Sequence, residues 1–514
     1  MFLPVVTRRR FLRSAASVAA VGLGGCGAWR RGSTASTASD AGAWVNDVHS
    51  QINPTHVAGV EQPGDLAALA RRVEQANRAG ESLSLCGGRH AGGGQQFLSE
   101  RVLLDLAKLD RVTGFDPVAG TVDIEAGARW PKVLAELRRV QHGDPVWSVH
   151  QKQGGADELS LGGAIASNVH GRCLASRPIV QDVLAMRVVL PDGKIVECSR
   201  RDEAELFGRV VGGYGLFGVV ASVTLQLERR SKLVRRVRWI DVSDAVTVLE
   251  ACRDAGAWHG DFQFSVDPAA TDFCTGGLCS WYEPVANTTP IRSVQPEAEA
   301  EQTRQLLELV HQDKAKAMSI YRDALLAADG QAVDWSDDWQ RGKYEHGYHK
   351  AIDKLRPDDG PASEILSELY VPREALAGYL TAAAGVLRET NAELIYGVVR
   401  LIERDDETVL AWATQSYACV IFNLHTSLRP HAIEKNAAVF RRLLDEAIAR
   451  GGSYYLTYHR FARIEQTLAC YPQLPSVLAD KNRLDPRSTL SSDWHAYYRD
   501  RVHAVSHPGK RLSV

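Results

Sequence analysis

Hydrophobic and polar residues follow two different periods along the chain, and each period predicts one type of element. Over residues 65–79 apolar residues recur at helical spacing, which predicts a helix that Gly80 ends. Over residues 219–227 every second position is apolar, which predicts a strand with one buried face. The first half of the chain therefore mixes helices and strands.

The same two periods predict the remaining elements. Strands are expected at 57–60, 83–85, 102–106, 121–125, 182–190 and 194–198, and helices at 130–139 and 201–211. The composition shifts near residue 229, and beyond it strands are expected at 235–242, 262–266, 368–371, 394–401 and 418–424, with longer helices at 297–327 and 433–449. We interpret the charged region 297–327 as a cap or lid insertion rather than a repeat.

A loop rich in glycine follows the predicted strand at 83–85. Its sequence from residue 82 is SLSLCGGRHAGGGQQF, with five glycines and one histidine, His90. Glycine has no Cβ and tolerates positive φ, so it suits backbone that passes close to a ligand. Successive backbone N–H groups in such a loop bind phosphate oxygens without any lysine. We predict that the loop holds a cofactor's phosphates and that His90 reaches its reactive end; the alternatives are a flexible surface loop and a structural histidine.

Two further small-residue stretches follow. LGGAIASNVHG begins at Leu161, about 75 residues after the first loop, and by itself is also consistent with a helix contact. Residues 213–218, GYGLFG, match G-x-G-x-x-G literally, but a dinucleotide site needs a strand before the motif and a helix after it. Here the order is reversed, so a nicotinamide site is not predicted. The first two stretches instead suggest one large ligand lying between them.

These stretches, in this order, resemble the vanillyl-alcohol-oxidase-like flavoproteins, the family with the p-cresol-methylhydroxylase-type FAD domain. CGGRHAGGGQQF, SLGGAIASNVHGR and GGYGLFGVVASVTLQL are similar to its three FAD loops. YYLTYHR and LADKNRLDPRSTLSSDW are similar to its C-terminal return, in which Lys481, Asp485 and Trp494 fit a recurring pattern. The resemblance covers residues 57–227 and roughly 422–494, and it is nearest to the sugar and aldonolactone oxidases.

The resemblance implies an α+β fold, in which a two-part FAD-binding domain carries an inserted substrate (cap) domain of antiparallel sheet plus helices. The expected limits are 45–230 for the FAD-binding domain, 231–430 for the cap domain, and 431–514 for the segment that returns. The expected FAD contacts are Gly87, Gly88, Arg89, His90, Ala91, Gly94, Gln95, Gly162, Gly163, Ser167, Asn168, His170, Gly171, Gly218, Val219 and Val220.

The resemblance also implies a covalent bond between His90 and the 8α-methyl carbon of the flavin. Some relatives have a second bond, through a cysteine before the double glycine of the second loop. Residues 153–156 read QGGA, with no cysteine, so a single bond through His90 is expected.

A flavin that oxidises an alcohol needs a base for the hydroxyl proton and positive charge near the N1–C2=O edge. Alternation over residues 394–404 puts Arg400 on one face with Val398, and related oxidases use an arginine from such a strand. Many of them have a glutamate where this chain has Val398, which argues against a polyol held in the same way. Tyr458 and His459 are further catalytic candidates by position, with a buried structural Tyr–His pair as the alternative.

The predicted function is therefore that of an FAD-dependent oxidoreductase. It is expected to oxidise a CH–OH group of a sugar, aldonolactone or similar polar alcohol by hydride transfer to flavin N5. Two alternatives stay open: a C=C reductase of the sterol-reductase branch, and a flavin-carrying binding or assembly protein without turnover. The electron acceptor is open among oxygen, a quinone and a cytochrome.

The N-terminus predicts export. Residues 7–13, TRRRFLR, match a twin-arginine signal, and the small-residue run at 14–25 is too short to span a bilayer. Leu23-Gly24-Gly25-Cys26 also looks like a lipoprotein processing site, so a signal at 1–26, a lipid anchor at Cys26 and a flexible linker at 27–44 are expected. Twin-arginine systems move folded proteins, which agrees with a cofactor inserted before export to the periplasm.

Composition excludes other classes of function. The net charge of −2 and the 7% aromatic content give no reason to expect a nucleic acid as partner. Nine cysteines are too few for a disulfide scaffold, and the nearest pair, Cys274 and Cys279, has no second pair to complete a zinc site. No metal site is predicted, and one local disulfide stays open.

Overall fold

The computed structural model describes residues 42–142, 146–291, 296–340, 342 and 349–506. The predicted export signal, Cys26 and most of the predicted linker lie outside these residues. The linker was expected to run to residue 44, but Ala43–Val45 forms strand β1, which pairs with β2 (Thr55–Val57). In the described part of the chain, no helix combines the length and apolar content that a bilayer crossing requires.

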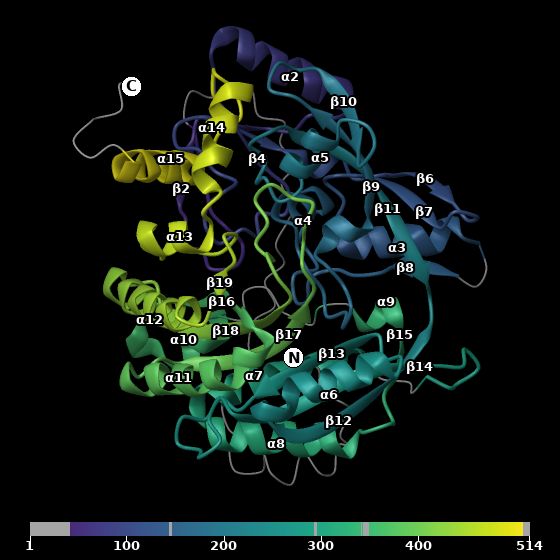
Figure 1. Cartoon of the computed structure of the whole chain (residues 1–514), viewed down its shortest axis with the longest axis vertical. Helices are drawn as coiled ribbons and strands as arrows, with labels where there is room; N and C mark the ends of the chain where they lie inside the picture. Colours follow the sequence, from purple (N-terminus) through teal and green to yellow (C-terminus); the bar gives the residue numbers. More distant parts are fainter. Residues whose placement is uncertain (1–41, 143–145, 292–295, 341, 343–348, 507–514) are drawn as a thin grey trace, which may run out of the picture.

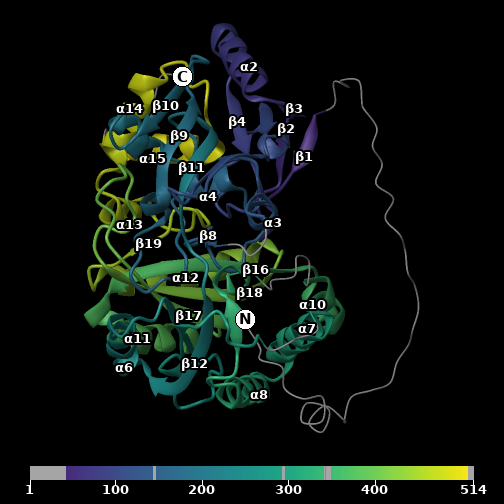
Figure 2. The same ribbon diagram turned by 90° about the vertical axis from the view of Figure 1, so that its right-hand side faces the viewer.

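The described residues form two layers, and the first and last described segments belong to the same layer (Figure 1). Of the described residues, those within 43–229 and 455–506 form the upper layer, and those within 232–454 form the lower layer. The view turned by 90° shows the same division, with the purple and yellow elements together above the green ones (Figure 2).

The upper layer contains two main sheets and four helices from the N-terminal half. The parallel sheet has the order β3 (Gly59–Glu61), β5 (Val102–Asp105), β4 (Leu83–Cys86). The antiparallel sheet has the order β10 (Ile195–Ser199), β9 (Val183–Val189), β11 (Val219–Arg229), β7 (Thr121–Glu125), β6 (Val112–Asp116), and β8 (Trp147–Val149) pairs with the end of β11. The helices are α2 (Leu66–Ala79), α3 (Trp130–Val140), α4 (Leu161–Ser167) and α5 (Ala204–Val210).

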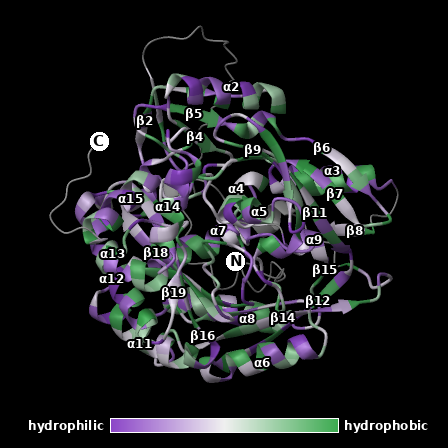
Figure 3. Ribbon diagram, turned by 45° about the horizontal axis from the view of Figure 1, so that its top comes forward, coloured by the Kyte–Doolittle hydropathy of each residue, from purple (hydrophilic) through white to green (hydrophobic). Residues whose placement is uncertain are grey.

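Helix α2 illustrates why the sequence forms these elements. The Asp65 side chain accepts a hydrogen bond from the N–H of Ala68, and Gly80 ends the helix in the left-handed conformation with φ of 71°. Leu69 and Val73 are fully buried on one side. Hydrophilic and hydrophobic residues therefore both appear along α2 in Figure 3.

The C-terminal segment completes the upper layer beside β4. The N–H of Leu83 donates to the carbonyl of Thr489 at 2.7 Å, and the N–H of Ser491 donates to the carbonyl of Leu83 at 2.9 Å. These bonds add residues 489–491 to the parallel sheet, directly before the first glycine loop. The segment's helices are α13 (Ile464–Cys470), α14 (Leu474–Leu484) and α15 (Asp493–Ser506).

The lower layer is built on one eight-stranded sheet. Its order is β15 (Val333–Trp335), β12 (Lys232–Asp241), β14 (Gly276–Val285), β13 (His259–Phe264), β17 (Leu394–Ile402), β18 (Tyr417–Ser427), β16 (Ala362–Pro372), β19 (Ser453–Tyr454). One face is covered by α6 (Val242–Asp254), α11 (Leu376–Glu389) and α12 (Pro430–Ile448), and the other is turned toward the upper layer (Figure 2). Helices α7 (Pro296–Gln312), α8 (Lys314–Ala327) and α10 (His349–Leu355) lie beside the sheet.

Several predicted limits differ from the observed ones. The region 297–327 is two helices, because the Asp313 side chain accepts from the N–H of Lys316 and starts α8 there. Strand β16 extends well before residue 368, and β14 was missed; both are buried on two faces, so they lack the alternation that marks a half-buried strand. Helix α12 and strand β19 pack with the large sheet, so the chain returns to the upper layer near residue 455 and not at 431.

Two interpretations of local motifs can be compared with the fold. The G-x-G-x-x-G stretch does lie between a preceding helix, α5, and a following strand, β11, which confirms the reversed order. Cys274 and Cys279 are buried free thiols, so the local disulfide left open by the sequence is not formed.

Candidate functional site

A large cavity lies between the two layers, with the three small-residue stretches above it and the face of the eight-stranded sheet below. Most of the predicted site residues line it. They are Gly87, Gly88, Arg89, His90, Ala91, Gln95, Gly162, Gly163, Ser167, His170, Gly218, Val219, Val220, Arg400 and Tyr458. Residues from distant parts of the sequence are therefore brought to one site.

Gly94, Asn168 and Gly171 were predicted for the site but are not among the residues that line the cavity. Gly94 has φ of 74° and forms a turn in the first loop. Asn168 is fully buried at the end of α4, where its Nδ2 donates to Asp405 Oδ2 at 2.9 Å. A Cβ at Gly171 would meet neighbouring backbone at 3.0 Å. All three residues therefore support the loops on the side that faces away from the cavity lining.

His459 was a catalytic candidate, but it packs behind the first glycine loop. A Cβ on Gly92 would lie 3.2 Å from Cε1 of His459, and the imidazole stacks on Phe461 with ring centres 4.9 Å apart. Burial lowers the pKa of His459 to about 4, so the ring is neutral. His459 is also absent from the cavity lining, so its position indicates a packing role.

The glycines of the first loop serve contacts within the protein as well as the cavity. A Cβ on Gly87 would lie 1.9 Å from Ser160 Oγ, and a Cβ on Gly88 would lie 2.2 Å from the carbonyl oxygen of Glu158. Only glycine therefore lets the first loop meet the second at these two positions. Gly154 has a similar role, because a Cβ there would lie 2.9 Å from Nη2 of Arg400.

The polar atoms around the cavity fit FAD. Oε1 of Gln95, Oε1 of Gln96 and Nε of Arg400 are buried and have no hydrogen-bond partner among the described residues. All three residues line the cavity, so it offers both open acceptors and a cationic donor. A flavin presents the complementary set, an N–H donor and carbonyl acceptors on its pyrimidine edge.

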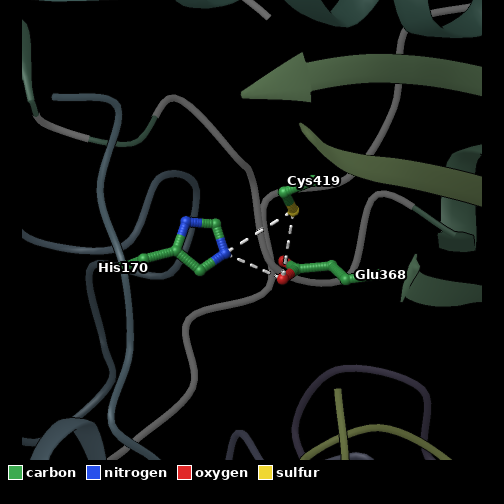
Figure 4. A group of neighbouring side chains, drawn as sticks. All are labelled: His170, Glu368 and Cys419. Carbon is green, nitrogen blue, oxygen red and sulfur yellow. Dashed lines mark hydrogen bonds and ion pairs between the residues drawn. The ribbon is translucent and has the colours of Figure 1, made fainter. Parts of the chain in front are cut away.

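His170, Glu368 and Cys419 form a buried cluster around the Glu368 carboxylate (Figure 4), and His170 and Glu368 line the cavity. Nε2 of His170 lies 2.9 Å from Oε2 of Glu368, and the hydroxyl of Tyr458 donates to Oε1 of Glu368 at 2.9 Å. Sγ of Cys419 lies 3.8 Å from both Nε2 of His170 and Oε2 of Glu368. The four side chains come from the second small-residue stretch, β16, β18 and the returning segment.

The surroundings of Glu368 keep it ionised. Burial alone would raise its pKa, but His170, the charge of Arg400 and the hydrogen bond from Tyr458 together hold the pKa below its usual value. Burial and Glu368 raise the pKa of Tyr458 well above its usual value, so Tyr458 stays a donor. Among the described residues, only Tyr458 donates to Oε1, which leaves one lone pair of that oxygen for another donor.

His170, Glu368 and Cys419 also have the atom types of a metal site, since their donor atoms lie within 4.8 Å of one another. Burial and the charge of Glu368 raise the pKa of Cys419 well above its usual value, so Cys419 stays a thiol and is a poor ligand. Nε2 of His170 and Oε2 of Glu368 already satisfy each other. We therefore interpret the cluster as a hydrogen-bonded carboxylate.

Sequence reasoning missed Glu368 and Glu364. Both lie in the largely apolar, buried segment ASEILSELYVP, four residues apart and so on one face of β16. Acidic side chains are rarely buried without a partner, so two of them at this spacing in an apolar strand were a usable signal.

Glu364 differs from Glu368 in its charge state. It is fully buried, and Nδ2 of Asn423 donates to its Oε2 at 2.5 Å. Nε2 of His311 lies 3.9 Å from Oε1, but burial lowers the pKa of His311 to about 3, so it brings no charge. Burial raises the pKa of Glu364 to about 8 despite the bond from Asn423, so the carboxyl is protonated at neutral pH.

This shift predicts how stability depends on pH. Between pH 4.5 and about 8 the unfolded chain loses the Glu364 proton and the folded chain keeps it, so folded wild type loses stability as pH rises. Glu364→Gln cannot titrate, so its stability relative to wild type is expected to rise by on the order of 4 kcal/mol across that window. Denaturant unfolding of both proteins at several pH values measures the difference. A constant difference would show that Glu364 titrates normally.

Comparison with known proteins finds similarity over part of the chain. Residues 57–199 match the family described as FAD binding domain, which confirms the resemblance found in the sequence. L-galactono-1,4-lactone dehydrogenase 1, mitochondrial, of Oryza sativa subsp. japonica is 31% identical over 243 residues, covering 42% of this chain and 40% of that protein. Cytokinin dehydrogenase 8 of Oryza sativa subsp. indica is 28% identical over 218 residues, covering 40% of this chain and 39% of that protein.

A bacterial protein is also similar. An uncharacterised oxidoreductase of the fasciation locus of Rhodococcoides fascians is 32% identical over 157 residues, covering 30% of this chain and 34% of that protein. The chain thus spans about two fifths or less of the length of each of these relatives.

Proposed function

Since residues 57–199 form an FAD-binding domain, we propose that the protein is an FAD-dependent oxidoreductase that oxidises the CH–OH group of a polar alcohol. Sugars and aldonolactones are members of that class. One observation carries the proposal: an ionised, buried glutamate, Glu368, lines the same cavity as the three small-residue stretches. The names of two relatives, a lactone dehydrogenase and a cytokinin dehydrogenase, support oxidation in general.

The residues of the cavity suit the proton and charge changes of alcohol oxidation. FAD, when bound, supplies the acceptor for the hydride that leaves the carbinol carbon. The open lone pair on Oε1 of Glu368 accepts the hydroxyl proton, so the carbinol becomes a carbonyl. His170 and Tyr458 hold the carboxylate in place, and buried Arg400 supplies the positive charge that balances negative charge gained in the cavity.

The two alternatives differ in what they require of the cavity. A C=C reductase needs an acid that delivers a proton; Glu368 is ionised, whereas the protonated carboxyl of Glu364 lines the same cavity. A binding protein without turnover needs no charged base inside the cavity. The ionised base Glu368 therefore favours oxidation over a binding role without turnover.

The proposal is tested by anaerobic reduction of the bound flavin. Holoenzyme is mixed with a panel of sugars, lactones and simple alcohols, and loss of the yellow absorbance is followed. Bleaching by at least one alcohol is expected. If no compound with a CH–OH group bleaches the flavin, while a reductant such as dithionite does, the proposed reaction is wrong.

His90 is proposed as the covalent attachment point of FAD. It lines the cavity from the first glycine loop, in the Gly-Gly-x-His position. Acid denaturation of wild type is expected to leave the flavin colour in the pellet, and His90→Ala is expected to release it to the supernatant. His49→Ala is the matched control, because His49 also lines the cavity and colour should stay in the pellet. Colour retained by His90→Ala would move the bond to another residue.

Export, a lipid anchor at Cys26 and the identity of the electron acceptor among oxygen, a quinone and a cytochrome stay predictions from the sequence.

A further inference from the structure

The floor of the cavity repeats one pattern on three neighbouring strands. Every second residue of β16, β17 and β18 faces the cavity side of the sheet. On β16 this series is Glu364, Leu366, Glu368; on β17 it is Tyr396, Val398, Arg400; on β18 it is Asn423, Ile421, Cys419. Each series is polar at one end, aliphatic in the middle and polar or ionisable at the other end.

The strand register aligns these series. Asn423 lies opposite both Leu366 and Tyr396, and Ile421 lies opposite both Glu368 and Val398. Of the three aliphatic residues, Leu366 and Ile421 line the cavity and form an aliphatic belt on its floor, and Leu307 of α7 lines the cavity as well. Leu366 lies between Glu364 and Glu368 along β16. The two glutamates lie four positions apart on an extended strand, a distance of about 13 Å.

The end formed by Glu364 and Asn423 has unused hydrogen-bonding capacity. Both residues line the cavity. Oε1 of Glu364 and Oδ1 of Asn423 are buried and have no hydrogen-bond partner among the described residues. Leaving buried polar atoms unpaired is costly, so a ligand group that bonds to them is strongly favoured.

The chemistry of this end selects an uncharged group. The Glu364 carboxyl is protonated at neutral pH and offers a donor, while Oδ1 of Asn423 offers an acceptor. A hydroxyl group satisfies both at once. An anionic group would place its charge in a buried region where burial already prevents Glu364 from ionising.

We propose that Glu364 and Asn423 form a second polar subsite, and that the substrate is an elongated alcohol with an aliphatic or aryl middle and a distal hydroxyl group. The oxidised carbon lies at the Glu368 end, the apolar middle lies on the Leu366–Ile421 belt, and the distal hydroxyl binds Glu364 and Asn423. This inference rests on the proposed alcohol oxidation and narrows its substrate class. A compact polyol is disfavoured, because its middle hydroxyls would lie on the belt without partners.

The test compares two series of compounds with the holoenzyme: 1-alkanols and α,ω-alkanediols of about four to twelve carbons, a range that includes the span of about 13 Å. The rate constant of anaerobic flavin reduction divided by the half-saturating concentration is measured for each compound. Diols long enough to reach both ends are expected to exceed the alkanol of equal length by about 10-fold, and short diols are expected to show no advantage. Equal values at every length, or a clear preference for sugars and lactones, would overturn the inference.

Two variants test whether the advantage of long diols over alkanols depends on Glu364 and Asn423. Glu364→Leu combined with Asn423→Leu removes both polar partners together, and it is expected to bring the ratio of long diol to alkanol to about one. Glu364→Gln has the shape and donor of a protonated carboxyl, so it is expected to keep most of the advantage. The flavin absorbance spectrum and the melting temperature of each variant establish that it is folded and loaded. If the double variant kept the full ratio, the subsite would lie elsewhere.

The outcomes separate the two proposals. If no alcohol, lactone or sugar reduces the flavin, the proposed function fails and the subsite fails with it. If alcohols reduce the flavin without dependence on length or on a distal hydroxyl, alcohol oxidation stands and only the second subsite is wrong.

Discussion

Glu368→Gln is expected to lower the rate of substrate-dependent flavin reduction by about 10²–10⁴-fold, the range for loss of a general base. Glutamine keeps the size of the side chain and its contacts with His170 and Tyr458, but it cannot accept the hydroxyl proton. The measurement is anaerobic stopped-flow reduction of the bound flavin by the best alcohol from the panel. Dithionite reduction of the same sample establishes that the flavin itself is intact.

A matched control is Glu374→Gln, which makes the same chemical change at an exposed position of the lower layer and should leave the rate as in wild type. A Glu368→Gln rate within about threefold of wild type would remove Glu368 from the proton transfer. The acid limb of the pH profile gives a second readout. The pKa of Glu368 is held below its usual value, so wild-type activity should persist through neutral pH and fall only as acid protonates the carboxylate.

Tyr458→Phe should move that acid limb upward. It removes one of the hydrogen bonds that hold the pKa of Glu368 down, so the carboxylate is protonated at a higher pH than in wild type. A purely structural role for Tyr458 would change the amplitude of the profile but leave its midpoint in place.

Lys481→Met is expected to destabilise the folded protein by about 3–5 kcal/mol, the range for breaking a buried ion pair. Nζ of Lys481 lies 2.5 Å from Oδ2 of Asp485, and both side chains are 1% exposed. The carboxylate of Asp485 also accepts from the backbone N–H groups of Thr489 and Leu490, at 2.9 Å each. Without Lys481 its charge is buried without a counter-charge, and this turn no longer holds the chain against Leu83.

The control lies on the same helix. Arg483 forms an exposed pair with Asp480 at 3.0 Å, so Arg483→Met should cost at most about 1 kcal/mol. Denaturant unfolding of the flavin-loaded proteins, followed by tryptophan fluorescence, gives both values. Equal stability of Lys481→Met and Arg483→Met would show that the buried pair does not hold the returning segment.

Elements whose partners are close in sequence were predicted well. Helix α2 followed from its apolar spacing and from Gly80, and the β9–β10 hairpin followed from Pro191-Asp192-Gly193. The reversed order around G-x-G-x-x-G was also correct. Each of these three features depends on contacts between residues that are close in sequence, so the local sequence pattern is enough to predict it.

The buried carboxylate of Glu368 could not be predicted in the same way. Glu368 meets His170 across 198 positions of the chain and Tyr458 across 90. These contacts depend on the register of β16 with β18 and on the return of the C-terminal segment, and a shift of one residue would turn Glu368 to the other face. His459 is the opposite case. It was predicted for the site from its position in the stretch YYLTYHR, but it does not line the cavity.

The sequence by itself determined the mixed helix and strand content, the three small-residue stretches and the FAD-binding domain that they indicate, since backbone approach to a ligand demands glycine at particular positions. Only the tertiary structure decided which side chains share the cavity, that Glu368 is ionised while Glu364 is protonated, and that an aliphatic belt lies between them. Those properties arise from burial and from neighbours on other strands, and no local stretch of sequence contains either.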